Sequence, residues 1–229
     1  MKRLAPLQVY EKLLSVYGPQ HWWPAEKPFE VMVGAILTQN TNWHNVEKAI
    51  ANLKAHDMLD CEAIASSNLE QLAEIIRPSG THIQKARYLQ QFSLFYHSNG
   101  KRQGLMKWPQ SLLRHRLLAV HGIGPETADS MLLYALDRPV YVVDAYTKRL
   151  FVRLGHFSHE LAYDSIQHYF QQRLPESLPL FQEFHALIVE HARRYCKAKP
   201  LCAECPLFDN CPTAVCTPRE ISRSLPDMD

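Results

Sequence analysis

Four cysteines towards the end of the chain are the residues whose type and spacing most clearly predict chemistry. Cys196, Cys202, Cys205 and Cys211 follow the pattern Cys-x5-Cys-x2-Cys-x5-Cys within sixteen residues. Thiolates at such spacing can hold an iron–sulfur cluster or a tetrahedral zinc ion, and the spacing by itself does not choose between them. The sequence therefore predicts a metal centre in this loop, with unmetallated thiols as the alternative.

A single carboxylate, Asp144, stands between the apolar run 140–143 and a helical pattern. As the N-cap of that helix it would accept backbone N–H bonds and lie near the positive helix end, which keeps a carboxylate ionised. A fixed carboxylate can also stabilise an oxocarbenium-like sugar or activate the water that attacks it. Capping alone is the alternative explanation, and the two roles are compatible.

A Gly-Ile-Gly turn joins two helical patterns over residues 113–136. Gly122 and Gly124 permit positive φ and close approach of another backbone, and the amides that open the second helix can meet a phosphate. Such a contact would position DNA without reading its sequence. A plain helix–turn–helix corner is the alternative, and Pro125 removes one amide donor.

The elements that must position these residues are predicted to be helices. The chain has 229 residues, of which 46% are hydrophobic and 21% charged, and apolar residues recur at intervals of three and four. Segment 29–37, apolar on nearly all sides and preceded by Pro28, predicts a central core helix. No apolar run approaches the roughly 20 residues that cross a bilayer, and the mixed N-terminal segment favours a cytoplasmic location, nucleoid-associated if the source is bacterial. The formal charge of +2 neither demands nor excludes a polyanionic partner.

Along the chain the hairpin comes first, Asp144 about twenty residues later and the four-cysteine loop last. In that order the three signals resemble the endonuclease III superfamily of DNA glycosylases, which has a helix–hairpin–helix motif, a catalytic Asp and a 4Fe–4S loop. The resemblance covers about residues 29–211 and extends to segment 37–41 (LTQNT) and to segment 78–80 (PSG), which leads to Lys85. It implies an all-α, two-lobed fold. One barrel-like helical domain would span 25–138 and carry the hairpin. The second would combine 1–24 with 139–229 and carry the four-cysteine loop and a flexible tail. The implied cofactor is a 4Fe–4S cluster, with zinc as the alternative.

Two departures from the family pattern matter. Bifunctional members have a Lys two residues after the second hairpin Gly, and its amine forms a Schiff base before strand cleavage. This chain has Glu126 there, and because a carboxylate cannot form the imine, we expect a monofunctional glycosylase. The first cysteine gap is five residues, whereas the family usually has six.

The chain resembles the 3-methyladenine DNA glycosylase III branch most closely, through Trp22-Trp23-Pro24, segment 77–80 and the residues around Glu126. This implies alkylated purines as substrates. Such a base already carries positive charge, so it leaves readily, and aromatic faces attract it by about 0.5–2 kcal/mol. Predicted pocket residues are Trp22, Trp23, Trp43 and Glu126, although core packing and a helix first turn are their alternative explanations.

The mechanism implied by the resemblance acts on double-stranded DNA that contains a damaged base, with a monomeric enzyme and no membrane. Gln39 or the adjacent Asn40 fills the gap left by the flipped nucleotide, and Asp144 stabilises the departing sugar cation. The residues expected to hold backbone phosphate are Gly122, Gly124, Lys148 and Arg149. Three rival hypotheses remain: a glycosylase for oxidised, deaminated or mismatched bases, a non-catalytic binder of damaged DNA, and a zinc-stabilised helical module without a DNA role.

Overall fold

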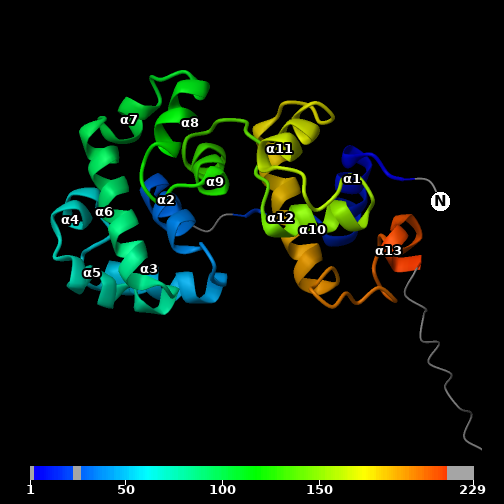
Figure 1. Ribbon diagram of the computed structural model, residues 1–229, viewed down its shortest axis with the longest axis horizontal. Coiled ribbons are helices and arrows are strands. Elements are labelled where there is room, and N and C mark those ends of the chain that lie inside the picture. Colours follow the sequence, from blue (N-terminus) through cyan, green and yellow to red (C-terminus); the bar gives the residue numbers. More distant parts are fainter. Residues whose placement is uncertain (1–2, 23–26, 216–229) are drawn as a thin grey trace, which may run out of the picture. The chain divides into compact units, whose positions relative to one another are not determined.

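The computed structural model describes residues 3–22 and 27–215, and every regular element in these residues is helical (Figure 1). The prediction of an all-α fold is confirmed. The chain divides into two compact units, one formed by Met1–Trp22 with Val143–Asp229 and the other by Trp23–Val142. Across the described ranges, no helix combines the length and apolar character needed to span a membrane.

The unit Trp23–Val142 is built around a central helix, α2. Nine of the ten residues of this helix, 29–37, are buried, and α2 packs against α3, α6 and α9 (Figure 1). A helix that is apolar on all sides can be stable only when neighbours surround it, so the core helix predicted from the sequence is confirmed. The helices of this unit are α2 (Pro28–Leu37), α3 (Trp43–Ala55), α4 (Cys61–Ser66), α5 (Leu69–Ile75), η1 (Arg77–Ser79), α6 (His82–Ser98), α7 (Lys101–Leu105), α8 (Gln110–Leu118) and α9 (Pro125–Ala135).

A buried lysine joins the end of α2 to the turn before α6. Lys85 is only 2% exposed, and its Nζ donates to the carbonyl oxygens of Leu37 at 2.8 Å and Ser79 at 2.6 Å. The ammonium thus supplies hydrogen bonds to two carbonyl oxygens that accept none from within a helix. Burial lowers the pKa of Lys85 to about 8.

In the unit formed by Met1–Trp22 and Val143–Asp229, α12 packs against α1 and α10. Its core is aromatic, with the ring centroid of Phe151 lying 4.6 Å from that of Phe170 and 6.2 Å from that of Phe184. Edge-to-face pairs of this kind add about 0.5–1.5 kcal/mol each beyond the burial of their area. The helices of this unit are α1 (Pro6–Tyr17), α10 (Ala145–Arg153), α11 (Tyr163–Gln171), α12 (Leu178–Arg194), η2 (Phe208–Asn210) and α13 (Pro212–Val215).

Candidate active site and cysteine loop

Asp144 is the N-cap of α10. The residue is 8% exposed, and Oδ1 accepts a hydrogen bond of 2.6 Å from the backbone N–H of Thr147. Residues 137–143 before it form neither helix nor strand. The predicted cap is confirmed, and it leaves Oδ2 available for a second contact.

That second contact comes from His185 on α12, a residue that the sequence reasoning missed. Its Nε2 lies 3.4 Å from Oδ2 of Asp144, and His185 is 5% exposed. Burial by itself raises the pKa of Asp144, but His185 and the Thr147 amide lower it, so the pKa of the carboxyl lies below its usual value. Asp144 is therefore a buried group that stays ionised at neutral pH.

The sequence did carry a signal for His185. It lies between Phe184 and Ile188 on the apolar stripe of α12, which makes it a polar residue at a buried position. Such a residue needs a polar partner, but periodicity does not say which one. The partner, Asp144, is 41 residues earlier in the chain.

The predicted hairpin consists of α8, a turn at 119–124, and α9. Gly122 has φ +88°, and a methyl group added there would lie 2.1 Å from Cδ1 of Tyr88, so this position requires glycine. Gly124 caps α9 with φ −87° and does not use the positive φ that glycine permits. A methyl group at Gly124 would meet no atom of the described residues within 4 Å, so this end of the hairpin is open.

Gln39 and Gly122, both predicted to contact DNA, lie together. Nε2 of Gln39 donates to the carbonyl oxygen of Gly122 at 2.9 Å and to Oγ1 of Thr127 at 3.1 Å. The next residue, Asn40, is exposed and has φ +54°. The segment after α2 is therefore fastened to the hairpin through one side chain.

A hollow lies beside this hairpin and was not anticipated from the sequence. Its walls include basic and aromatic side chains of α6 together with His121 from the turn, whose ring lies 5.3 Å from that of Tyr88. The lining residues are Thr81, His82, Ile83, Gln84, Arg87, Tyr88 and His121.

The predicted pocket residues are distributed over both units. Trp22 belongs with α1, and its ring centroid lies 5.4 Å from that of His185. Trp43 packs against the core of the other unit, where Glu126 lies exposed in the first turn of α9. Trp23 lies outside the described residues.

Lys148 and Arg149 both bond within their own unit. Nζ of Lys148 donates to the Leu161 carbonyl at 3.1 Å, and Nε of Arg149 donates to the Cys196 carbonyl at 2.8 Å. Arg149 thereby connects α10 to the cysteine loop.

The four loop cysteines line one cavity, together with apolar side chains of α10 and His191 of α12. The sulfur atoms have polar neighbours. Nη1 of Arg153 lies 3.2 Å from Cys196 Sγ, and Nε2 of His191 lies 3.7 Å from Cys205 Sγ. Burial, assisted by the charges of the other three thiols, raises the pKa of Cys205 to about 11. Four thiolates could share this cavity only around a strongly positive centre.

The spacing of the sulfur atoms bears on the kind of centre. Within the described ranges, no three of these four sulfur atoms lie within 4.8 Å of one another. In a tetrahedral zinc site with Zn–S bonds of about 2.3 Å, the sulfurs are roughly 3.8 Å apart. The described sulfurs are therefore not placed as a tetrahedral zinc site requires, and four thiolates are a donor set that zinc and an iron–sulfur cluster share.

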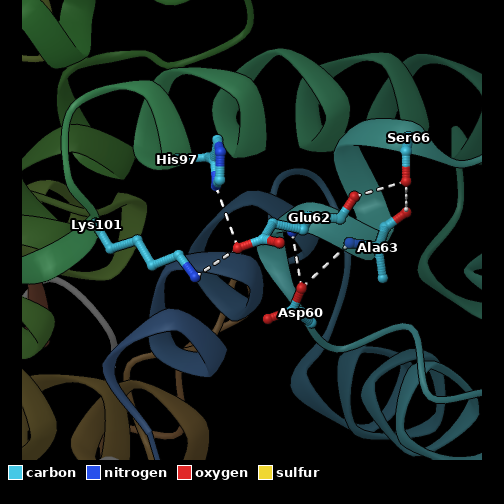
Figure 2. Close-up of polar contacts among 6 residues, drawn as sticks. All are labelled: Asp60, Glu62, Ala63, Ser66, His97 and Lys101. Carbon is cyan, nitrogen blue, oxygen red and sulfur yellow. Dashed lines mark hydrogen bonds and ion pairs between the residues drawn. The ribbon is translucent and has the colours of Figure 1, made fainter.

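A second group of metal-ligand side chains occurs in the unit Trp23–Val142. The ligand atoms of Cys61, Glu62 and His97 lie within 4.8 Å of one another. The carboxylate of Glu62 already accepts a 2.8 Å bond from Lys101 Nζ and lies 3.4 Å from Nδ1 of His97, while Asp60 caps α4 (Figure 2). Because the Lys101 ammonium already pairs with the Glu62 carboxylate at 2.8 Å, we assign this group as an ion-pair network that joins α4 to α6 and α7.

Comparison with known proteins gives the class to which this fold and site belong. Residues 33–176 match the HhH-GPD superfamily of base excision DNA repair proteins. The chain belongs to this superfamily, as the resemblance in the sequence implied, and is a DNA glycosylase of the base excision repair type.

Individual relatives cover most of the chain. A Methanocaldococcus jannaschii protein named as a DNA repair glycosylase is 48% identical over 207 residues, which is 89% of this chain and 94% of that one. Endonuclease III of Thermotoga maritima is 31% identical over 80% of this chain and 82% of its own length. The crystal structure of Helicobacter pylori 3-methyladenine DNA glycosylase with bound 1,N6-ethenoadenine shares 32% identity, with a TM-score of 0.73 over 83% of this chain and 98% of that one.

Proposed function

We propose that this glycosylase hydrolyses the N-glycosidic bond of alkylated purines in duplex DNA and leaves an abasic site without cutting the strand. The observation that carries the proposal is Asp144, a buried carboxylate that stays ionised. An anion fixed in a site of low dielectric stabilises a developing sugar cation more strongly than it would in water. The substrate class is supported by the similarity to the Helicobacter pylori 3-methyladenine enzyme.

The reaction follows from the charge of the substrate. The bond between C1′ and the base nitrogen breaks, its electron pair leaves with the base, and the alkylated purine departs as a neutral molecule. The positive charge passes to the sugar, where Asp144 stabilises it. Water then bonds through its oxygen to C1′ and releases one proton, which completes the hydrolysis.

The absence of strand cleavage is supported by the hairpin. A lyase needs a neutral amine at the sugar, and the family position for it holds Glu126, a carboxylate exposed at the start of α9. Lys85 has the lowered pKa, to about 8, that suits a nucleophile. Its Nζ is nevertheless buried and bonded to two carbonyl oxygens, so it does not supply the amine.

Within the proposal, the open hairpin end at Gly124 and the amides that begin α9 hold backbone phosphate. The hollow beside it adds Arg87, His82 and His121 for further phosphate contacts. Gln39 and Asn40 fill the gap left by the flipped nucleotide, and Gln39 must first release its bonds to Gly122 and Thr127. Lys148 and Arg149 contribute less to phosphate binding than the sequence suggested, because both side chains already donate to carbonyl oxygens.

The flipped base is proposed to stack against aromatic side chains, among which Trp22 and Trp43 are the described candidates. A cationic purine gains about 0.5–2 kcal/mol from each aromatic face that it contacts. A neutral base lacks this cation–π attraction, so the pocket favours alkylated purines.

We further propose that the cysteine loop holds a 4Fe–4S cluster through Cys196, Cys202, Cys205 and Cys211. When bound, the cluster supplies a rigid cross-link between residues that are otherwise far apart in the loop. Arg149 and Arg153 then tie this loop to α10, which begins at Asp144. The role of the centre is structural.

The test uses purified protein and methylated duplex DNA, with released bases identified by mass spectrometry and nicks scored before and after alkali. We expect 3-methyladenine-type bases in the supernatant and nicks only after alkali. The matched control is Asp144→Asn, which should bind the same DNA and release no base.

Two other results would replace the proposal. Release of oxidised or deaminated pyrimidines alone, from a parallel panel of lesions, would favour the activity suggested by the similarity to endonuclease III of Thermotoga maritima. Retention of alkylated duplex without release of any base would favour a damaged-DNA binder.

A further inference from the structure

A buried histidine faces the carboxylate on which the proposed reaction depends. His185 lies on α12, and its Nε2 is 3.4 Å from Oδ2 of Asp144. We propose that His185 is the positioning residue for Asp144 and holds the carboxylate in its reactive orientation. This inference rests on the proposed function of Asp144.

The two oxygens of Asp144 are held from two different helices. Oδ1 accepts from the Thr147 amide of α10, whereas Oδ2 meets His185 of α12. One contact would leave the carboxylate free to turn about its Cβ–Cγ bond. The second contact fixes the plane of the group, so that its orientation depends on the packing of α12 against α10.

The imidazole is itself held in place. The Trp22 ring lies against it at 5.4 Å between centroids with an angle of 56° between planes, and His185 is 5% exposed. Trp22 was predicted to line the base pocket, and here it lies on the residue that holds the carboxylate. A ring restrained in this way loses little entropy when it orients Asp144.

Charged and titratable side chains near α12 have partners other than His185. On α10, Lys148 and Arg149 point to the carbonyl oxygens of Leu161 and Cys196. On α1, Lys12 bonds to Asn210, and the hydroxyl of Tyr17 pairs with His191. On α12 itself, Glu183 accepts from the Gln20 amide.

The experiment measures single-turnover base release and DNA affinity for four proteins: wild type, His185→Gln, His185→Leu and His168→Gln. We expect His185→Leu to lose about 10²-fold in rate, with the affinity for substrate DNA unchanged. His185→Gln keeps an N–H donor, so it should recover most of the rate. His168, exposed on α11, serves as the matched histidine, and His168→Gln should retain the wild-type rate.

The inference is overturned if His185→Leu releases base at the wild-type rate, or if His185→Gln is as slow as His185→Leu. Asp144→Asn is assayed alongside. If that variant is fully active, the role of Asp144 fails, whereas an inactive Asp144→Asn together with unaltered His185 variants rejects only the role of His185. Should His185→Leu not fold, the comparison of His185→Gln with His185→Met, which has no donor, decides the question.

Discussion

Arg114 and Asp129 join the two helices of the hairpin through a pair of parallel hydrogen bonds. Nε of Arg114 on α8 lies 2.7 Å from Oδ1 of Asp129 on α9, and Nη2 lies 3.0 Å from Oδ2. Asp129 is completely buried, whereas the Arg114 side chain is 23% exposed. The geometry is that of the bidentate guanidinium–carboxylate pair, which fixes both distance and orientation.

Removing the arginine should therefore destabilise the hairpin. We expect Arg114→Met to lower the free energy of unfolding by about 3 kcal/mol, because the Asp129 carboxylate would stay buried without its cation. Urea denaturation measures the change. The double variant Arg114→Met, Asp129→Leu removes both charges and should recover part of the loss. A double variant as unstable as the sum of its two single variants would mean that the pair is not coupled.

The two hairpin glycines give a matched pair of substitutions. Gly122→Ala should lower the free energy of unfolding by about 1–2 kcal/mol because of the positive φ, and by a further amount because the added methyl group meets Tyr88. The same variant should bind DNA more weakly. Gly124→Ala should cost less than about 1 kcal/mol, because φ is negative and the space is open. Thermal unfolding and DNA titration compare the two variants. Equal losses of stability would contradict the turn geometry.

Replacing the hairpin carboxylate with an amine should add lyase activity. We expect Glu126→Lys to form a Schiff base with the abasic sugar, so that borohydride traps a covalent protein–DNA complex. The wild type and the control Glu126→Gln should form none, because neither has an amine there. Trapping of the wild-type protein would show that another amine reaches the sugar.

The lowered pKa of His156 leads us to expect that the folded protein loses stability in acid. Burial, together with the charges of Arg3 and Arg173, lowers the pKa of His156 to about 4. The unfolded chain, with a histidine pKa of about 6.5, then binds more protons than the folded chain between these two values. Stability should therefore decrease as the pH falls from about 6.5 to 4, by at most about 1.4 kcal/mol per pH unit.

The corresponding variant is His156→Gln, in which the slope of unfolding free energy against pH should be smaller over that interval. The exposed His168 again provides the control, since His168→Gln should leave the slope unchanged. An unaltered slope in His156→Gln would mean that the native ring accepts the proton as readily as the unfolded chain does.

If the cysteine loop holds iron, the iron content should depend on the half-buried thiol of Cys205. Cys205→Ser should lower the iron content and the visible absorption at about 400 nm, because the cavity loses one of its four sulfur ligands. Cys61→Ser, a buried cysteine of the other unit, should retain both signals. Stoichiometric zinc and no iron in the wild-type protein, purified without air, would reject the cluster.

The sequence by itself determined the features that depend on neighbouring residues. Segment 29–37 is apolar on nearly all sides, and this predicted the core helix α2. Asp144 precedes a helical pattern and is its cap, because the cap bond joins residues three apart. The cysteine spacing and the order of the motifs identified the family, since both are properties of the linear chain.

Only the tertiary structure decided the contacts between residues far apart in the chain. His185 meets Asp144, Gln39 meets the Gly122 carbonyl, and the described thiols share one cavity. Helical periodicity says that a position is buried, but it does not say which side chain of another helix lies opposite. That choice is made by the packing of whole helices, which no local pattern contains.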